Sequence, residues 1–230
     1  MDEKEIQSYY SGHFTDADAL YMRRALQLAA AGKGHVAPNP MVGAVIVAPD
    51  GRVIGEGWHR HYGTPHAEVN AVASVADNDR HLLPQSTIYV TLEPCSHYGK
   101  TPPCAKLLIE TGFRRVVSAT VDPNPLVAGR GLKMLADAGI QTEVGLLGDE
   151  SRRLNKVFFT AHTHHRPFIT LKWAQSADGY LATQIPSRSD SEAPQSTPES
   201  MLVFERQETG QVIPIGLSSP IGIRYVHMRR

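Results

Sequence analysis

The sequence predicts an α/β protein whose sheet is largely parallel beyond one hairpin. A nearly continuous apolar and β-branched run at residues 41–48 is followed by Asp50-Gly51, the strongest short hairpin signal in the chain, and then by a second strand pattern at 52–58. From residue 67 onward, helical and strand patterns alternate. Hydrophobic residues make up 41% of the chain, which is enough for a core and too much for a disordered protein.

The elements follow in order along the chain. Apolar residues recur at helical spacing over 16–31, where Thr15 or Asp16 can cap the start of a helix and Gly32 can end it. The hairpin comes next. After it we expect a helix at 67–76, a strand at 87–92, a helix at 104–111, a strand at 115–121, a helix at 131–138, a strand at 141–147, a helix at 149–159 and a strand at 167–174.

The composition indicates one ordinary domain followed by a different segment. Residues 15–160 have the size of a normal single domain. Residues 184–200 contain five Ser and three Pro, so they favour a linker or an insertion. The last thirty residues hold one short apolar stretch, at 212–217, and are too few to form a domain alone.

Charge and the start of the chain exclude several classes of protein. Lys and Arg total 23 and Asp and Glu total 23, and this balance argues against broad binding to nucleic acid. The first residues are polar and acidic and resemble no signal peptide, and no apolar run reaches the roughly eighteen residues of a membrane span. We therefore expect a cytoplasmic protein without a membrane partner. In that compartment the two cysteines are more often metal ligands or catalytic groups than a disulfide.

Two segments carry the pattern of a zinc site. His66-x-Glu68 opens a predicted helix, Pro94-Cys95 follows a predicted strand, and Cys104 opens the next helix. One His and two Cys form a known ligand set for catalytic zinc, which keeps its fourth position for water and lowers the pKa of that water. Glu68 can then carry the proton of the water to a ring nitrogen and to leaving ammonia. The pattern is typical of zinc deaminases.

The spacing leaves alternatives open. Eight residues separate Cys95 from Cys104, whereas zinc deaminases usually have two. The intervening SHYGKTPP is rich in turn-forming residues and can bulge outward while its ends meet at one metal. The cysteines can instead form a disulfide, or zinc can be structural with His97 as a fourth ligand. A deaminase acting on a base, nucleoside or tRNA, or a non-catalytic zinc module, also fits the pattern.

Several stretches of the sequence resemble one family closely. They are APNPMVGAVIV, GEGWHRHYGTPHAEV, YVTLEPCSHYGKTPPC and VDPNPLVAGRGLKMLADAGI. They resemble the bifunctional riboflavin-biosynthesis enzymes that join diaminohydroxyphosphoribosylaminopyrimidine deaminase to 5-amino-6-(5-phosphoribosylamino)uracil reductase. The resemblance covers about residues 18–183, and the eight-residue gap is habitual in this family. It implies a three-layer α-β-α fold like that of cytidine deaminase, with a mixed sheet.

The resemblance also implies an activity. The expected reaction is hydrolytic deamination of 2,5-diamino-6-ribosylamino-4(3H)-pyrimidinone 5′-phosphate to 5-amino-6-(5-phosphoribosylamino)uracil and ammonia. His66, Cys95 and Cys104 would bind Zn²⁺, and Glu68 would be the proton shuttle. The expected partner is this small phosphorylated pyrimidine, in a homo-oligomeric protein that binds neither nucleic acid nor membrane.

Five further residues match substrate-binding positions of the family. A phosphorylated ribose needs a cation and several hydrogen-bond donors, and a lysine in the loop between the cysteines suits phosphate. Each of these residues can also have a purely structural role. The lysine can be solvated, the asparagines can form turns, the histidine can lie at a strand edge and the aspartate can cap a strand. The matching residues are Asn39, His59, Lys100, Asp122 and Asn124.

Two other patterns receive no role from the resemblance. Gly129-Arg130-Gly131 precedes a predicted helix and can cradle an anion, but the motif is weak. His162, His164 and His165 resemble a metal-binding tract, and a solvated turn is the expected interpretation.

The resemblance to the reductase half begins and then fails. PFITLKWAQSADGYLA at 167–182 matches its opening strand and turn, which places Ala174 near an NADP site. The Ser/Pro-rich stretch 184–200 replaces the next expected segment. We therefore expect 166–230 to be a truncated reductase start, with NADPH used only by complete family members. An intact bifunctional enzyme would instead consume NADPH.

Overall fold

The fold is described from a computed structural model. The described residues fall into two units, Met1–His165 and Arg166–Arg230, and the first unit holds the large sheet. The structure describes residues 5–6, 10, 12–97, 102–125 and 127–170, and the backbone of 204–206, 212–214 and 227–228.

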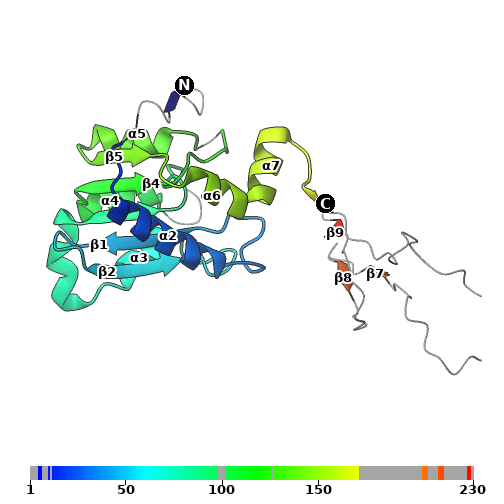
Figure 1. The fold of residues 1–230 in the computed structure, drawn as a ribbon, viewed down its shortest axis with the longest axis horizontal. Helices are drawn as coiled ribbons and strands as arrows, with labels where there is room; N and C mark the ends of the chain where they lie inside the picture. The colour runs from blue at the N-terminus through cyan, green and yellow to red at the C-terminus, as the bar shows by residue number, and fades with distance from the viewer. Residues whose placement is uncertain are drawn as a thin grey trace, which may run out of the picture. The chain divides into compact units, whose positions relative to one another are not determined.

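The first unit is built on a five-stranded mixed sheet in the order β2-β1-β3-β4-β5 (Figure 1). Strand β1 (Gly43–Val47) pairs antiparallel with both β2 (Val53–Trp58) and β3 (Thr87–Val90). Strands β4 (Arg115–Ser118) and β5 (Gln141–Val144) continue the sheet parallel to β3. The predicted hairpin and mixed sheet are confirmed.

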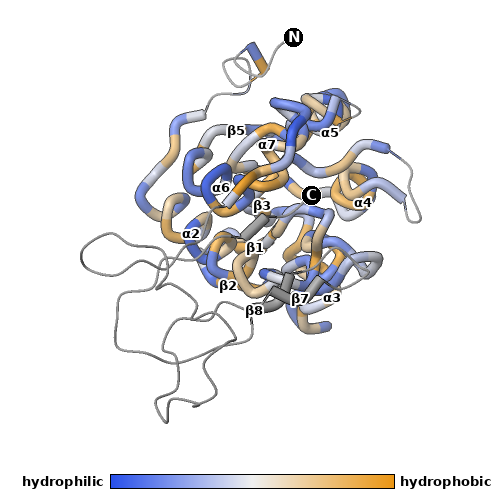
Figure 2. The backbone as a smooth tube through the Cα atoms, turned by 90° about the vertical axis from the view of Figure 1, so that its right-hand side faces the viewer, coloured by the Kyte–Doolittle hydropathy of each residue, from blue (hydrophilic) through white to orange (hydrophobic). Residues whose placement is uncertain are grey.

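Both faces of the sheet are covered, so the central strands are apolar on both sides. In β1, Ala44 and Ile46 belong to one core cluster, and Val45 and Val47 belong to another. This alternation explains why the strand forms a continuous apolar run in the sequence. The helices in Figure 2 show hydrophilic and hydrophobic residues along their length, as expected for helices that cover a sheet.

Each core cluster is completed by helices. Helix α2 (Asp16–Ala30) contributes the helical residues of one cluster. Helices α3 (Ala67–Ala73), α4 (Cys104–Thr111) and α5 (Arg130–Asp137) contribute those of the other. The predicted three-layer α-β-α arrangement is therefore confirmed.

The position of α3 depends on a glycine in β2. A Cβ at Gly57 would lie 2.3 Å from the amide nitrogen of Ala71 and 2.5 Å from the carbonyl oxygen of Ala67, closer than side-chain carbons come. Helix α3 therefore packs directly on the backbone of β2. Its first turn, which carries the His66–Glu68 motif, is held at a fixed place beside the sheet.

The strands predicted over 87–92, 115–121 and 141–147 are shorter than predicted and end at Val90, Ser118 and Val144. Two helical regions also differ from the sequence-based prediction. The helix predicted over 67–76 ends at Ala73, and a 3-10 helix, η1 (Asp77–Gln85), follows it. This segment lacks the apolar periodicity that predicts a helix and contains Pro84.

The helix predicted over 149–159 is two helices, α6 (Gly148–Leu154) and α7 (Lys156–His164). They meet at Asn155, whose φ of −103° and ψ of 26° interrupt the helical path. The buried side chain of Asn155 hydrogen-bonds another part of the chain, which accounts for the break.

The second unit contains two short antiparallel pairs. Strand β6 (Ile169–Thr170) pairs with β9 (His227–Met228), and β7 (Phe204–Arg206) pairs with β8 (Val212–Pro214). Ala174 and the stretch 184–200 lie outside the described residues. No helix in the part of the chain that the structure describes is long and apolar enough to cross a membrane.

Candidate active site

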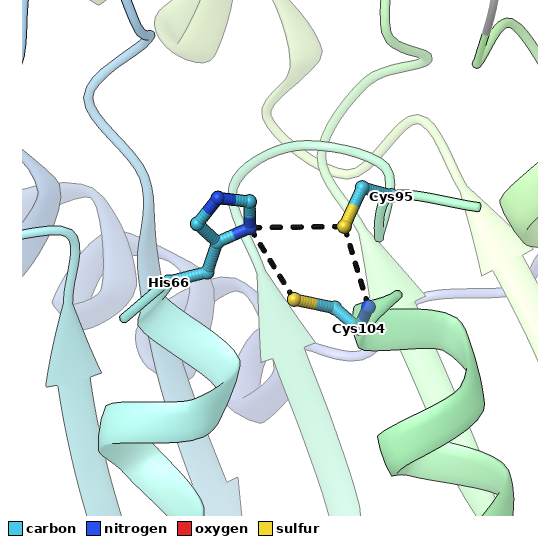
Figure 3. Close-up of side chains that lie close together, drawn as sticks. All are labelled: His66, Cys95 and Cys104. Carbon is cyan, nitrogen blue, oxygen red and sulfur yellow. Dashed lines mark hydrogen bonds between the residues drawn. The ribbon is translucent and has the colours of Figure 1, made fainter. Parts of the chain in front are cut away.

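The three candidate metal ligands come together from three elements (Figure 3). His66 precedes the first turn of α3, Cys104 is the first residue of α4, and Cys95 lies in the loop after β3. His66 Nδ1 lies 3.7 Å from the Sγ of Cys95 and 3.4 Å from the Sγ of Cys104. The ligand atoms all lie within 4.8 Å of one another. Both cysteines are free, so the disulfide alternative is not realised.

The chemistry of this group suits zinc. One imidazole and two thiolates are soft to borderline ligands that favour zinc over magnesium or calcium. Among the described residues His97 is not part of the group, although it lies in the same region. Three protein ligands are typical of catalytic zinc, whereas structural zinc usually has four.

The charges within the group favour a cation between its ligands. The hydrogen bond from Cys104 and the neighbouring His66 lower the pKa of Cys95 to about 4, despite the opposing effect of burial. Its hydrogen bond with Cys95 raises the pKa of His66 to about 9. The hydrogen bond with Cys95 and burial both raise the pKa of the Cys104 thiol. Without metal, a proton on His66 therefore balances a thiolate, and a bound cation can take over that role.

Glu68 lies in the first turn of α3 beside these ligands. Its side chain is buried, with 3% of the residue exposed. Burial raises the pKa of its carboxyl to about 7, and the charge of nearby Cys95 acts in the same direction. A carboxyl that titrates near neutral pH can both accept and release a proton, which is what general acid–base catalysis requires.

Two of the candidate ligands, His66 and Cys95, border a pocket of about 340 Å³. The pocket brings together four of the five predicted substrate-binding residues, namely Asn39, His59, Asp122 and Asn124, with His66, Glu68 and Cys95. Lys100 lies outside the described residues, so its predicted role remains a prediction.

Asn39 and His59 are connected within this pocket. His59 Nδ1 lies 3.2 Å from the carbonyl oxygen of Pro65, and His59 Nε2 lies 3.2 Å from Asn39 Nδ2. Because a carbonyl can only accept, Nδ1 carries the proton and Nε2 accepts from the Asn39 amide. Burial lowers the pKa of His59, which favours this neutral form. His59 thus orients Asn39 and leaves the Asn39 amide oxygen as an acceptor.

Asp122 and Asn124 follow β4 and form a local turn. The backbone N–H of Asn124 donates to Asp122 Oδ1 at 2.8 Å. Burial raises the pKa of the Asp122 carboxyl to about 6. The turn holds both residues at the pocket wall.

Glu93 is a buried residue at the pocket that the sequence analysis did not single out. Its carboxylate accepts N–H groups from Gly129 and Gly131, each at 2.9 Å, from Asp122 at 3.2 Å and from Leu132 at 3.4 Å. Burial nevertheless raises its pKa to about 7. The weak anion-cradle motif at 129–131 is therefore filled by a carboxylate of the same chain. The available signal was an acidic residue directly before Pro-Cys.

A close backbone contact reinforces this connection. A Cβ at Gly131 would lie 1.9 Å from the carbonyl oxygen of Pro94, so only glycine allows α5 to approach so near. The backbone N–H of Ala105 donates to the carbonyl oxygen of Cys95 at 3.1 Å, and that of Cys104 donates to Cys95 Sγ at 3.3 Å. The loop that carries Cys95 is thus fixed to α4 on one side and to α5 on the other.

Helix α7 adds Phe158 and His162 to the pocket lining. The interpretation of His162 as part of a solvated turn was wrong, because this residue lies within α7 and is half-buried. His164 and His165 are exposed. The prediction of a solvated turn failed because a tract rich in histidine has no hydrophobic periodicity that would distinguish the buried side of a helix from its exposed side.

The comparison with family models defines the class. The model for the cytidine and deoxycytidylate deaminase zinc-binding region matches residues 15–120. Together with the three-layer fold and the His/Cys/Cys group, this match shows that residues 15–120 are similar to the zinc-binding region of cytidine and deoxycytidylate deaminases.

Over much the same part of the chain, the sequence is similar to the RibD riboflavin-biosynthesis proteins. RibD of Aquifex aeolicus is 50% identical over 168 residues, which are 73% of this chain and 46% of the relative. RibD of Haemophilus influenzae is 50% identical over 169 residues, 74% of this chain and 44% of the relative. The chain spans about half the length of the curated relatives it matches.

Solved structures agree with this placement. The diaminohydroxyphosphoribosylaminopyrimidine deaminase/5-amino-6-(5-phosphoribosylamino)uracil reductase of Thermotoga maritima superposes with a TM-score of 0.68 at 46% identity. The match covers 72% of this chain and 47% of that protein.

Proposed function

We propose that this chain deaminates 2,5-diamino-6-ribosylamino-4(3H)-pyrimidinone 5′-phosphate by hydrolysis, giving 5-amino-6-(5-phosphoribosylamino)uracil and ammonia in riboflavin biosynthesis. One observation carries the proposal: buried Glu68 lies with His66 and Cys95 at a pocket of about 340 Å³, and Cys104 completes the ligand group with these two residues. The identity of 50% to RibD proteins supports this choice of substrate.

The residues of the metal group have a simple division of roles. His66, Cys95 and Cys104 hold Zn²⁺, which when bound supplies a Lewis acid that lowers the pKa of water. Glu68 takes a first proton from the attacking water and delivers it to the ring nitrogen, and then takes the second proton, from the hydroxyl added to the ring carbon, and delivers it to the amino group, which leaves as ammonia. Its pKa of about 7 suits both directions of transfer.

The remaining pocket residues bind the substrate. Asn39 presents its amide oxygen to an amino group of the pyrimidine, and His59 holds it in place from 3.2 Å. Asp122 and Asn124 bind the ribose side, and Lys100 binds the phosphate. A pocket of this volume matches small-molecule sites in general, which range from about 300 to 1,000 Å³.

The wider setting follows from the same family. We propose a cytoplasmic homo-oligomer whose partner is the small phosphorylated pyrimidine and that binds no nucleic acid, in line with equal numbers of acidic and basic residues. NADPH belongs to the reductase half of complete family members, where the position of Ala174 would lie near it.

A substrate panel tests the proposal. Ammonia release by the full zinc-loaded chain is measured with the diaminopyrimidine ribosylphosphate, its dephosphorylated form, cytidine and deoxycytidylate. We expect the first compound to give the highest kcat/KM. A preference for cytidine or deoxycytidylate would favour a deaminase of other substrates. Bound zinc without ammonia release from any compound would indicate a non-catalytic zinc module.

A further inference from the structure

We propose that helix α7 is part of the substrate site and determines specificity, with Phe158 contacting the substrate and His162 binding its phosphate. This inference rests on the proposed function. None of the substrate-binding residues implied by the resemblance comes from this helix.

The two side chains form one continuous wall of the pocket. Phe158 and His162 are four residues apart in α7, which places them one above the other on the same helix face. Their ring centroids lie 4.5 Å apart with an interplanar angle of 56°. Both residues are half-buried and line the pocket, whereas the next residue, Phe159, is buried in the protein. The wall thus offers an apolar ring with an imidazole beside it.

A clasp holds this wall next to Asn39. The backbone N–H of Met41 donates to Asn155 Oδ1 at 2.8 Å, and Asn155 Nδ2 donates to the carbonyl oxygen of Met41 at 2.8 Å. Asn155 directly precedes α7 and is 3% exposed. The start of α7 is therefore fixed to the segment that carries Asn39, and a ligand held by Asn39 lies within the same pocket as Phe158 and His162.

The charges around the pocket favour α7 as the phosphate side. Glu68, Glu93 and Asp122 line the other walls, and a dianionic phosphate would be repelled by them. By contrast, residues 156–165 contain no acidic side chain.

Histidines are the cation-forming residues that line the described part of the pocket. His66 belongs to the metal group, and both ring nitrogens of His59 are occupied by Asn39 and Pro65. His97 and His162 therefore remain to donate to a phosphate, and His162 is the one placed on the wall without carboxylates. Lys100, if it binds the phosphate as proposed, would act together with His162.

A set of α7 variants in the full zinc-loaded chain tests this inference. His162→Ala is compared with His164→Ala, which changes the same residue type on an exposed position of the same helix. For His162→Ala we expect KM for the phosphorylated substrate to rise about tenfold with little change in kcat, because a charge-assisted hydrogen bond is lost. KM for the dephosphorylated substrate should stay constant, and His162→Lys should restore most of the loss. Phe158→Ala should raise KM for both substrates, since its contact does not depend on the phosphate.

The controls separate this inference from the function on which it rests. Zinc content, measured by atomic absorption, should be equal in all variants. The inference is overturned if wild type is active and His162→Ala has the same KM as His164→Ala. It is also overturned if His162→Ala raises KM equally for the phosphorylated and the dephosphorylated substrate. A wild-type chain that neither deaminates the phosphorylated substrate nor binds its deaminated product would overturn the proposed function as well.

Discussion

Carboxylates with little exposure to solvent occur in two regions of the first unit, Met1–His165, and their charges are balanced in opposite ways. In the first region, Arg115 bridges α2 and the sheet: its Nη1 lies 2.6 Å from Asp18 Oδ1, and its Nε donates to Glu143 at 2.8 Å. The Tyr89 hydroxyl also donates to Asp18, at 2.5 Å. Burial alone would raise the pKa of Asp18, but hydrogen bonds from Arg115, Tyr89 and Thr15 hold it well below its usual range.

The second region surrounds the candidate metal group. Burial raises the pKa of Glu68 and of Glu93 to about 7 and that of Asp122 to about 6. Within the part of the chain that the structure describes, no Arg or Lys side chain forms an ion pair with these three. In the first region, Arg115 neutralises the carboxylates within the chain. In the second region, the charge of the carboxylates is balanced by a proton, a metal or a ligand. The second kind is typical of functional sites.

The largest expected effect separates the two regions by activity. Glu68→Gln should lower kcat for ammonia release by about a thousandfold, because the amide cannot transfer the proton. Zinc content should not change. Glu143→Gln, the matched change in the first region, should leave kcat of the folded protein unaltered. An equal loss of kcat in Glu68→Gln and Glu143→Gln would contradict the assignment of a catalytic role to the second region alone.

The next effect separates them by stability. Arg115→Met should lower the free energy of unfolding by about 3 kcal/mol, because it leaves Asp18 and Glu143 buried without their cation. Urea unfolding measures this loss. Activity per folded molecule at low temperature should match wild type. A variant as stable as wild type would show that the ion-pair cluster does not hold α2 to the sheet.

A smaller effect concerns the metal. Glu93→Gln replaces an acceptor of four backbone N–H groups by an amide that can accept at one oxygen only. Because Glu93 fixes the loop that carries Cys95, zinc affinity should fall about tenfold to a hundredfold in a chelator competition. Glu143→Gln serves again as the control and should keep the affinity of wild type. An unchanged zinc affinity in Glu93→Gln would show that Glu93 caps the start of α5 without fixing the metal ligand Cys95.

The smallest effect is a difference in pH dependence. The pKa of Asp122 rises from 3.8 unfolded to about 6 folded, so its protonated form favours folding below about pH 4, and this contribution disappears as the pH rises through 6. Asp122→Asn, which stays neutral, should therefore gain about 2 kcal/mol relative to wild type between pH 4 and pH 7.

Asp18 should behave in the opposite way. Its lowered pKa stabilises the fold above pH 3.8, and this contribution is lost as the pH falls. Asp18→Asn should be destabilised at pH 7 and approach wild type in acid. Urea midpoints at about pH 2.5, 4.5 and 7 on the zinc-free protein measure both variants, with the Asp122→Asn difference expected between the two higher values and the Asp18→Asn difference expected between the two lower ones. Parallel profiles would contradict the assigned pKa shifts.

Sequence patterns predicted much of this fold because local signals agreed with the final packing. The hairpin at Asp50-Gly51 and the alternation of strands and helices gave the order of elements, and the His66-x-Glu68 and Pro94-Cys95 motifs gave the metal group. Within each motif the deciding residues are neighbours in the chain, and the known zinc-deaminase pattern joined the separate motifs into one group.

Contacts between distant segments that belong to no known motif could not be predicted. Asn155 interrupts a helix because its side chain pairs with Met41, 114 residues away. Glu93 binds the start of α5 across a separation of 38 residues. His162 lines the pocket from α7, and the hydrogen bonds between Asn155 and Met41 fix the start of that helix. None of these partners is visible in a local pattern.

Removal and return of the metal tests the central claim most directly. The chain is stripped with a chelator, zinc is added back in steps, and ammonia release from the diaminopyrimidine ribosylphosphate is followed. We predict that activity disappears on stripping and returns in proportion to bound zinc, while a chain with Cys95→Ser recovers little. Activity that survives the loss of zinc, or zinc that returns without ammonia release, would contradict the account.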